Sequence, residues 1–244
     1  GIKNLCLAGG VALNCVANGK LLNEKIFDNI WIQPAAGDAG GSLGAALALW
    51  YLEQKNPRHI DQNDSMQGSY LGPEYSQNEI EDELKNIGAK FSVIEEDKLI
   101  NKTAEDLSNE MAVGWFQGRM EFGPRALGGR SILGDPRAEN TQKNLNLKVK
   151  YRESFRPFAP SILRDDLSEW FQFDLDSPYM LMVANINAEK TFEIREDQEK
   201  LFGIDKLNIK RSEIPAVTHV DYSARIQTVH KETNEKYYKL ISRF

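Results

Sequence analysis

Cysteine and histidine are scarce in this sequence, and long apolar runs are missing. Of the 244 residues only Cys6 and Cys15 are cysteines, which excludes a disulfide framework and favours a reducing, cytoplasmic location. No apolar stretch approaches the roughly 18–20 residues that span a bilayer. No secretory signal or transit peptide opens the chain, so we expect neither export nor a membrane partner.

Positive charge is also in deficit. Lys and Arg number 30 against 36 Asp and Glu, giving a net charge of −6. This balance argues against a dedicated nucleic-acid-binding protein, which needs an extended basic face. Hydrophobic residues at 41% and charged residues at 27% are typical of globular proteins, so wholesale disorder is not expected. The length allows one large domain or two small ones.

The three histidines, His59, His219 and His230, include no pair at metal-ligand spacing on a helix. Neither cysteine has a histidine nearby in sequence, so hydrolysis by a catalytic triad is not supported. We interpret His219 and Asp221, two apart on an expected strand, as a structural hydrogen-bonded pair. Both cysteines are interpreted as small core residues.

The first 54 residues predict an α/β unit. Apolar runs at 3–8 and 29–33 predict strands, each followed by a glycine turn and a helix, at 11–25 and 43–52. This order is typical of a parallel sheet. A polar stretch without periodicity follows, and we interpret residues 55–77 as a linker between two domains.

The second half predicts an α+β or mixed α/β domain. Helical spacing marks segments near 80–87 and 100–111, and the Asp135-Pro136 pair predicts the start of a helix that runs to about 149. Strands are expected at 90–94, 112–117, 159–163, 179–184, 216–220 and 225–229. Residues 118–130 form a Gly/Arg-rich loop, 187–213 an exposed insertion, and 235–244 a closing helix.

Two glycine turns form the first candidate site. If the two leading strands are parallel neighbours, both turns lie at the sheet edge where α/β proteins bind ligands, and each opens a helix whose free N–H groups attract anions. Asp38 adds a carboxylate suited to a metal ion that bridges phosphates. Ordinary tight turns remain an equal alternative, because neither turn matches a phosphate loop or a dinucleotide fingerprint. The candidate nucleotide-binding residues are Gly9, Gly10, Asn14, Gly37, Gly40 and Gly41.

Clustered cations form the second candidate site. Residues 118–131 hold three arginines against Glu121 alone, and Lys148, Lys150, Arg152 and Arg156 lie within nine residues. Guanidinium groups on a flexible loop suit phosphate or carboxylate recognition, so we expect a pocket for a small, multiply charged anion. We interpret Lys148 and Arg152 as solvated surface charge. Arg119, Arg125 and Arg156 lie among glycine, proline and apolar residues, and Arg225 on a half-buried strand needs a partner.

Five segments together resemble the nodulation-protein-U-type O-carbamoyltransferases, and the likeness covers nearly the whole chain. These segments are LCLAGGVALNCVANGKL, IWIQPAAGDAGGSLGAAL, GWFQGRMEFGPRALGGRSIL, NLKVKYRESFRPFAPSIL and IPAVTHVDYSARIQTV. The loop around Arg125 is the most specific of them.

This resemblance implies two modules. Residues 1–54 would be the end of an actin/hexokinase-like (ribonuclease-H-like) ATPase module, in the version found in the universal tRNA threonylcarbamoyladenosine proteins. Residues 78–244 would be an α/β domain similar to threonylcarbamoyl-adenylate synthases. The second module would condense carbamoyl phosphate with ATP to give carbamoyl-adenylate and pyrophosphate. The first would pass the carbamoyl group to an acceptor hydroxyl with a divalent metal, typically iron, with magnesium as the alternative.

The resemblance also implies residue roles. Gly9, Gly10 and Asn14 match the nucleotide-contacting turn, and Asp38 matches the metal-ligating aspartate. Four cations match the clamp for carbamoyl phosphate and the phosphates of ATP: Arg125, Lys150, Arg156 and Arg225.

The chain departs from the family pattern in three places. The family's paired metal-binding histidines and its Asn-Thr-Ser-Phe-Asn stretch are absent, and Tyr222 stands where members usually have glycine. We therefore expect a fragment without full transferase activity. A small-molecule kinase and a non-catalytic nucleotide-binding or assembly domain are the alternatives. The sequence does not distinguish among a sugar, an antibiotic precursor and a lipid-linked oligosaccharide as the acceptor. It also leaves open whether the protein forms a homodimer.

Overall fold

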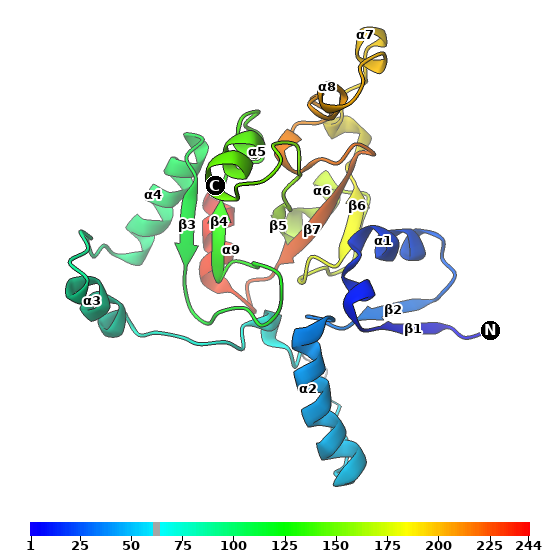
Figure 1. Cartoon of the computed structure of the whole chain (residues 1–244), viewed down its shortest axis with the longest axis vertical. Coiled ribbons are helices and arrows are strands. Elements are labelled where there is room, and N and C mark those ends of the chain that lie inside the picture. Colours follow the sequence, from blue (N-terminus) through cyan, green and yellow to red (C-terminus); the bar gives the residue numbers. More distant parts are fainter. Residues whose placement is uncertain (61–63) are drawn as a thin grey trace.

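The computed structural model describes residues 1–60 and 64–244 and has a mixed α/β architecture (Figure 1). Its first sheet pairs β1 (Asn4–Leu7) with β2 (Asn29–Ile32) in parallel, which confirms the expected arrangement of the leading strands. The segment between them begins with a 3₁₀ turn at Gly10–Leu13. Helix α1 (Cys15–Asn23) follows because the Asn14 side chain accepts from the backbone N–H of Ala17 and caps it.

Helix α2 (Asp38–Ala48) starts five residues before the expected position 43 and continues as a π-helical turn, Leu49–Glu53. None of its residues is buried, and it projects away from the remaining elements (Figure 1). Among the described residues, no helix combines the length and apolarity needed to cross a membrane.

Residues 54–76 contain only a short 3₁₀ turn (Gln67–Ser69) among the part the structure describes, and they lead into two helices. These are α3 (Gln77–Asn86), which Ser76 and Glu79 begin with a capping box, and α4 (Glu96–Ser108). The strand expected at 90–94 is wrong. Phe91, Val93 and Ile94 are exposed there, and no described segment pairs with their backbone.

The second sheet is an antiparallel hairpin of β3 (Val113–Phe116) and β4 (Arg130–Leu133), which encloses the Gly/Arg-rich loop. The third orders β5 (Ser161–Leu163), β7 (Ser223–Val229) and β6 (Met182–Asn185), with β5 parallel and β6 antiparallel to β7. The expected strand at 216–220 is instead a 3₁₀ turn, Pro215–Val217, because proline opens the segment without an N–H to donate.

The helix expected after Asp135-Pro136 begins only at α5 (Thr141–Asn144) and continues as a π-helical turn, Leu145–Val149. Asp135 does not cap it, because its carboxylate accepts from the backbone N–H and the guanidinium of Arg137. The remaining helices are α6 (Leu167–Trp170), α7 (Glu196–Glu199), α8 (Ile204–Leu207) and α9 (Glu235–Arg243), with 3₁₀ turns at Arg164–Asp166 and Ala188–Lys190.

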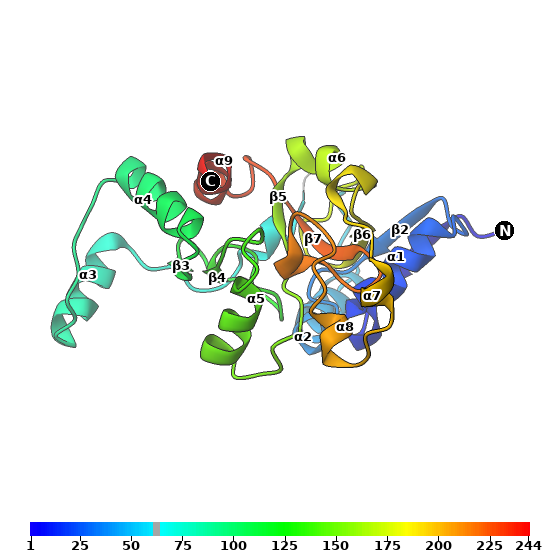
Figure 2. The same ribbon diagram turned by 90° about the horizontal axis from the view of Figure 1, so that it is seen from above.

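The excursion between β6 and β7, with α7 and α8, extends beyond the end of the third sheet in Figure 1, and in Figure 2, seen from above, these two helices lie toward the viewer. Helix α1 packs on β6, where the Asn18 amide donates to the backbone oxygen of Leu181 at 2.9 Å. A Cβ on Gly19 would lie 2.6 Å from Val183 Cγ2, so glycine permits this close approach. The first 53 residues therefore share packing with the second half. The cysteines are not core residues as expected, since Cys6 is exposed and Cys15 half-buried.

Candidate active site

A cavity of about 400 Å³ lies between the β3–β4 hairpin, the π-helical turn Leu145–Val149, β5, β7 and α9. Three of the four candidate clamp residues line it, Arg125, Lys150 and Arg225, and Arg152 joins them. No aspartate, glutamate or histidine is among its described lining residues. The remaining walls are mainly apolar, including Leu133, Phe158 and Phe244. A net positive, partly apolar hollow of this size suits an organic anion.

Arg125 and Arg225 carry unused hydrogen-bonding capacity. The Nε atom of each is buried, and neither Nε atom has a hydrogen-bond partner among the described residues. Burial lowers the pKa of Arg225, and the charges of Arg125 and Arg152 lower it further against the opposing effect of Cys15. A buried, unpartnered guanidinium beside two others is unfavourable until an anion neutralises it. The pair is therefore arranged for an anionic ligand.

The loop that carries Arg125 is folded around Glu121. This buried carboxylate accepts from the backbone N–H groups of Leu127, Gly129 and Arg130 at 2.7, 2.8 and 3.1 Å. The guanidinium of Arg130 donates to backbone oxygens of the same hairpin and lies 3.5 Å from the centre of the Phe116 ring. Arg119 pairs with Glu74 at 3.6 Å. Of the three loop arginines, only Arg125 lines the cavity.

In the second basic segment, the arginine that lines the cavity is Arg152 and not Arg156, contrary to the sequence-based prediction. Arg152, interpreted from sequence as surface charge, lines the cavity, with its guanidinium 4.9 Å from the centre of the Phe158 ring. Arg156 is not among the lining residues, is exposed, and pairs with Glu153 at 3.6 Å. Lys150 has helical backbone angles and Tyr151, between the two cations, has a φ of +49°, so neither strand nor helix spacing in the sequence indicates that Lys150 and Arg152 both line the cavity.

The two glycine turns meet at one edge of the first sheet, because the N–H of Gly9 donates to the backbone oxygen of Ala36 at 2.7 Å. Gly9 has φ of +90°, and Gly10 and Gly41 are exposed, with open space where a Cβ would stand. Gly40 serves packing instead, because a Cβ there would lie 2.4 Å from the Ala35 oxygen. A Cβ on Gly37 would make ordinary van der Waals contact with Leu13, at 3.4 Å. Asn14 is exposed and caps α1.

Asp38 lies exposed in the first turn of α2. Among residues 1–60 and 64–244, no group of three or more His, Cys, Asp or Glu side chains is arranged to hold a metal ion. A divalent cation takes several oxygen or nitrogen ligands, so one carboxylate does not fit it.

A second hollow of about 550 Å³ has the opposite charge. Asp64, Glu74 and Glu232 line it, with Arg119 as its cation. This net negative surface does not suit an anionic ligand.

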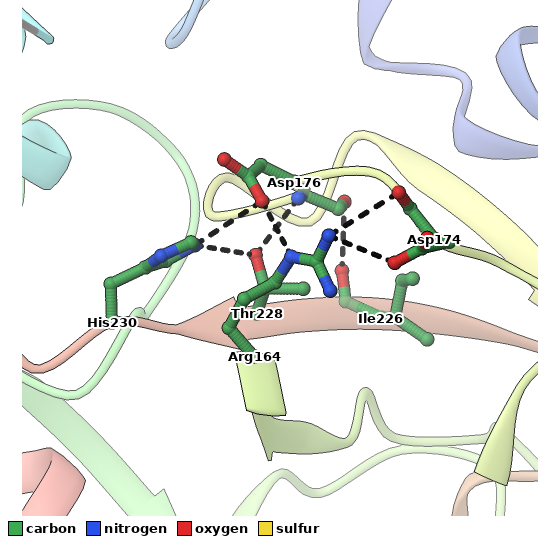
Figure 3. A network of polar contacts seen from close by, with 7 residues as sticks. Arg164, Asp174, Asp176, Ile226, Thr228 and His230 are labelled. Atoms are coloured by element: carbon green, nitrogen blue, oxygen red, sulfur yellow. Dashed lines mark hydrogen bonds and ion pairs between the residues drawn. The ribbon is translucent and has the colours of Figure 1, made fainter. Parts of the chain in front are cut away.

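No histidine takes part in the cavity lining that the structure describes. His219 Nδ1 lies 3.1 Å from Ser223 Oγ, which donates to Asp221 at 2.7 Å, so the serine stands between the two expected partners. Figure 3 shows His230 beside Asp176 and Thr228, at 4.0 and 3.1 Å. Arg164 donates to Asp176 at 2.7 Å, which fixes the loop before β6 to the ends of β5 and β7.

Residues 104–244 match the family model described as Carbamoyltransferase C-terminus, and residues 1–47 match Carbamoyltransferase N-terminus. An uncharacterised protein of Synechocystis sp. is 58% identical over the whole chain, which covers 40% of that protein. Nodulation protein NolO of Bradyrhizobium diazoefficiens is 41% identical over the whole chain, which covers 41% of it.

A relative with a named reaction is 3'-hydroxymethylcephem-O-carbamoyltransferase of Streptomyces clavuligerus. It is 32% identical over 98% of the chain, which covers 39% of that protein. The chain thus spans about 40% of the length of these curated relatives.

Proposed function

Because this chain belongs to the carbamoyltransferase family, we propose that its cationic cavity binds carbamoyl phosphate and ATP and forms carbamoyl-adenylate. One observation carries the proposal: four cations and no carboxylate line the described cavity, and two of the cations have buried Nε atoms without a partner. Both substrates are phosphate anions, which guanidinium groups bind with charge-assisted hydrogen bonds.

The reaction that we propose consumes water so that its atoms balance. Water converts carbamoyl phosphate to carbamate and inorganic phosphate. A carbamate oxygen then attacks the α-phosphorus of ATP, the bond from that phosphorus to the bridging oxygen breaks, and pyrophosphate leaves with the electron pair. Negative charge grows on the leaving group during this step. Cations fixed in a partly apolar cavity stabilise that charge and orient the two anions.

The residues divide this work by position. Arg125 and Arg225, with buried Nε atoms, would hold the phosphates, and Lys150 and Arg152 would neutralise the leaving pyrophosphate. Arg156, whose charge reaches Arg152, would act from outside the lining. The edge with Gly9, Gly10, Asn14, Gly37 and Gly41 would contact a nucleotide of the transfer step, and Gly40 would allow the close packing of the second turn beside them.

Carbamoyl transfer to a hydroxyl of a small molecule or sugar would follow, with the hydroxyl oxygen attacking the carbamoyl carbon and AMP leaving. Since the chain spans about 40% of its relatives, we assign this step to a longer protein. Residues 1–54 would be the end of its ATPase-like module, residues 55–77 the connection, and residues 78–244 its adenylate-forming domain. Asp38 would be one ligand of a divalent metal there, and no step above depends on that ion.

The test is the product of the chain incubated with ATP and carbamoyl phosphate. The proposal expects pyrophosphate and AMP-linked product that require carbamoyl phosphate, and Arg225→Met should lower the rate at least tenfold. Arg195→Met is the matched control, because Arg195 is exposed and pairs only locally with Asp197. ADP release would indicate a kinase. No turnover by a folded chain would indicate a non-catalytic nucleotide-binding or assembly domain, and either result contradicts the proposal.

A further inference from the structure

Asn146 is a buried polar residue at the base of the second basic segment. It lies in the π-helical turn Leu145–Val149 and its side chain is 0% exposed. Its neighbour Leu145 lines the cavity, as does Lys150 directly after the turn. Short π-helical turns are rare in proteins, and those that occur are often found at functional sites.

The amide of Asn146 uses its donors and its acceptor on one segment. Oδ1 accepts from Arg152 Nε at 2.6 Å. Nδ2 donates to the backbone oxygens of Ser154 at 3.0 Å and Arg156 at 2.8 Å. The backbone oxygen of Asn146 also accepts from the N–H of Arg152 at 3.0 Å. One residue therefore fixes three positions of the segment that carries the cations.

Arg152 is held by neutral groups rather than by a carboxylate. Besides the bond from its Nε to Asn146, it stacks on the Phe158 ring, and none of the ion pairs in the described part of the chain involves it. Burial and the charge of Arg156 lower its pKa. An amide oxygen orients the guanidinium without cancelling its charge, which leaves the Nη edge and the full positive charge for a ligand.

We propose that Asn146 is a positioning residue of the clamp: its amide directs the guanidinium of Arg152 toward the cavity and fixes the turn from Lys150 to Arg156. This inference rests on the proposed function of the cavity as an anion site. It explains why an amide stands at this buried position, where a carboxylate would neutralise Arg152 and repel the oxygens of Ser154 and Arg156.

The experiment measures the affinity of the 244-residue chain for pyrophosphate alone, by calorimetric titration. Asn146→Asp should weaken binding at least tenfold. Asn144→Asp is the matched control, because it adds the same charge two residues away on an exposed part of the same helix, and it should change affinity less than twofold. Equal affinities for the wild type and Asn146→Asp would overturn the proposal.

A double-mutant cycle separates positioning from general support of the fold. Asn146→Ser, which adds no charge and serves also where the Asp variant does not fold, should weaken binding at least tenfold in the wild type. In the Arg152→Lys background the Nε bond is already gone but the bonds to the Ser154 and Arg156 oxygens remain, so the same change should cost at least threefold less than in the wild type. Equal losses in both backgrounds would overturn the inference. Absence of binding by the folded wild type would instead contradict the proposed anion site, and the inference with it.

Discussion

Arg125 Nη2 donates to the backbone oxygen of Leu13 at 3.1 Å, across 112 residues of sequence. Arg125 also lines the cavity, and its buried Nε has no partner among the described residues. Gly123 strengthens the connection, because a Cβ there would lie 2.6 Å from the Cβ of Ala35 in the second glycine turn. The edge of the first sheet and the cationic cavity thus meet on opposite sides of one loop.

Replacing Arg125 should weaken anion binding. Arg125→Met removes one of the four cavity cations, and a charge-assisted hydrogen bond contributes about 1.5–3 kcal/mol, so pyrophosphate affinity should fall roughly tenfold or more. The measurement is the pyrophosphate-dependent rise in Tm, which reports ligand affinity through mass action. Arg195→Met should keep the wild-type shift. The same shift in both variants would remove Arg125 from the site.

Glu121 should be a stability determinant of the loop. Glu121→Ala removes the acceptor of the backbone N–H groups of Leu127, Gly129 and Arg130, which leaves these buried groups without a partner. We expect a loss of about 2–3 kcal/mol in the free energy of urea unfolding. Glu139→Ala breaks only the surface pair with Lys210 and should cost no more than about 1 kcal/mol. Equal losses would show that the Glu121 contacts do not hold the fold.

Local sequence patterns correctly predicted the elements whose conformation depends mainly on residues close in sequence. Strand β1, strand β2 and helix α9 follow from apolar periodicity, and Arg125 and Arg225 stood out because apolar residues and glycines surround them. Positions that depend on distant partners were missed. Strand β4 forms only by pairing with β3, and residues 90–94 have strand composition but no described neighbour to pair with.

The same distinction explains the cations. Arg152 lines the cavity because the Asn146 amide and the Phe158 ring direct it there, and neither contact is visible in a run of basic residues. Arg156 has a local partner, Glu153, three residues away. A charge count along the sequence therefore found the segment but not the side chain that enters the cavity.

His219 should make stability depend on pH. Burial lowers the pKa of His219 against the opposing effect of Asp221, and Arg225 adds to the lowering. In the unfolded chain the histidine has a pKa of about 6.5 and takes up a proton as the pH falls through that value. In the folded chain His219 stays neutral over the same range, so acidification favours the unfolded state. The histidine has no such effect above about pH 7.5, and its destabilisation grows on acidification until the folded pKa is reached.

The measurement is urea unfolding of the wild type and His219→Gln across this range. The wild type should lose stability more steeply than the variant as the pH falls from about 7.5 to 5.5, and the two curves should run parallel above about pH 7.5. Parallel curves throughout would contradict a histidine that is kept neutral by the fold.

Tyr222 has a backbone φ of +64°, in the left-handed region that favours glycine. It occupies a tight turn in which its N–H donates to the oxygen of His219 and the N–H of His219 donates to the oxygen of Ser223. Its hydroxyl donates to the backbone oxygen of Phe192 at 3.2 Å, which ties the excursion to this turn. The glycine that is usual in the family at this position would adopt this backbone conformation without strain. The tyrosine adopts it at a cost and gains the hydrogen bond to Phe192.

A pair of variants isolates the backbone effect at this turn. Tyr222→Gly and Tyr222→Ala both lose the contact with Phe192, but only alanine keeps the cost of a left-handed Cβ, so the glycine variant should be more stable by about 1 kcal/mol in urea unfolding. At Tyr238, within helix α9, the same pair should show the opposite sign, with alanine more stable by about 1 kcal/mol. Glycine less stable than alanine at both positions would mean that Tyr222 does not hold a left-handed conformation in solution.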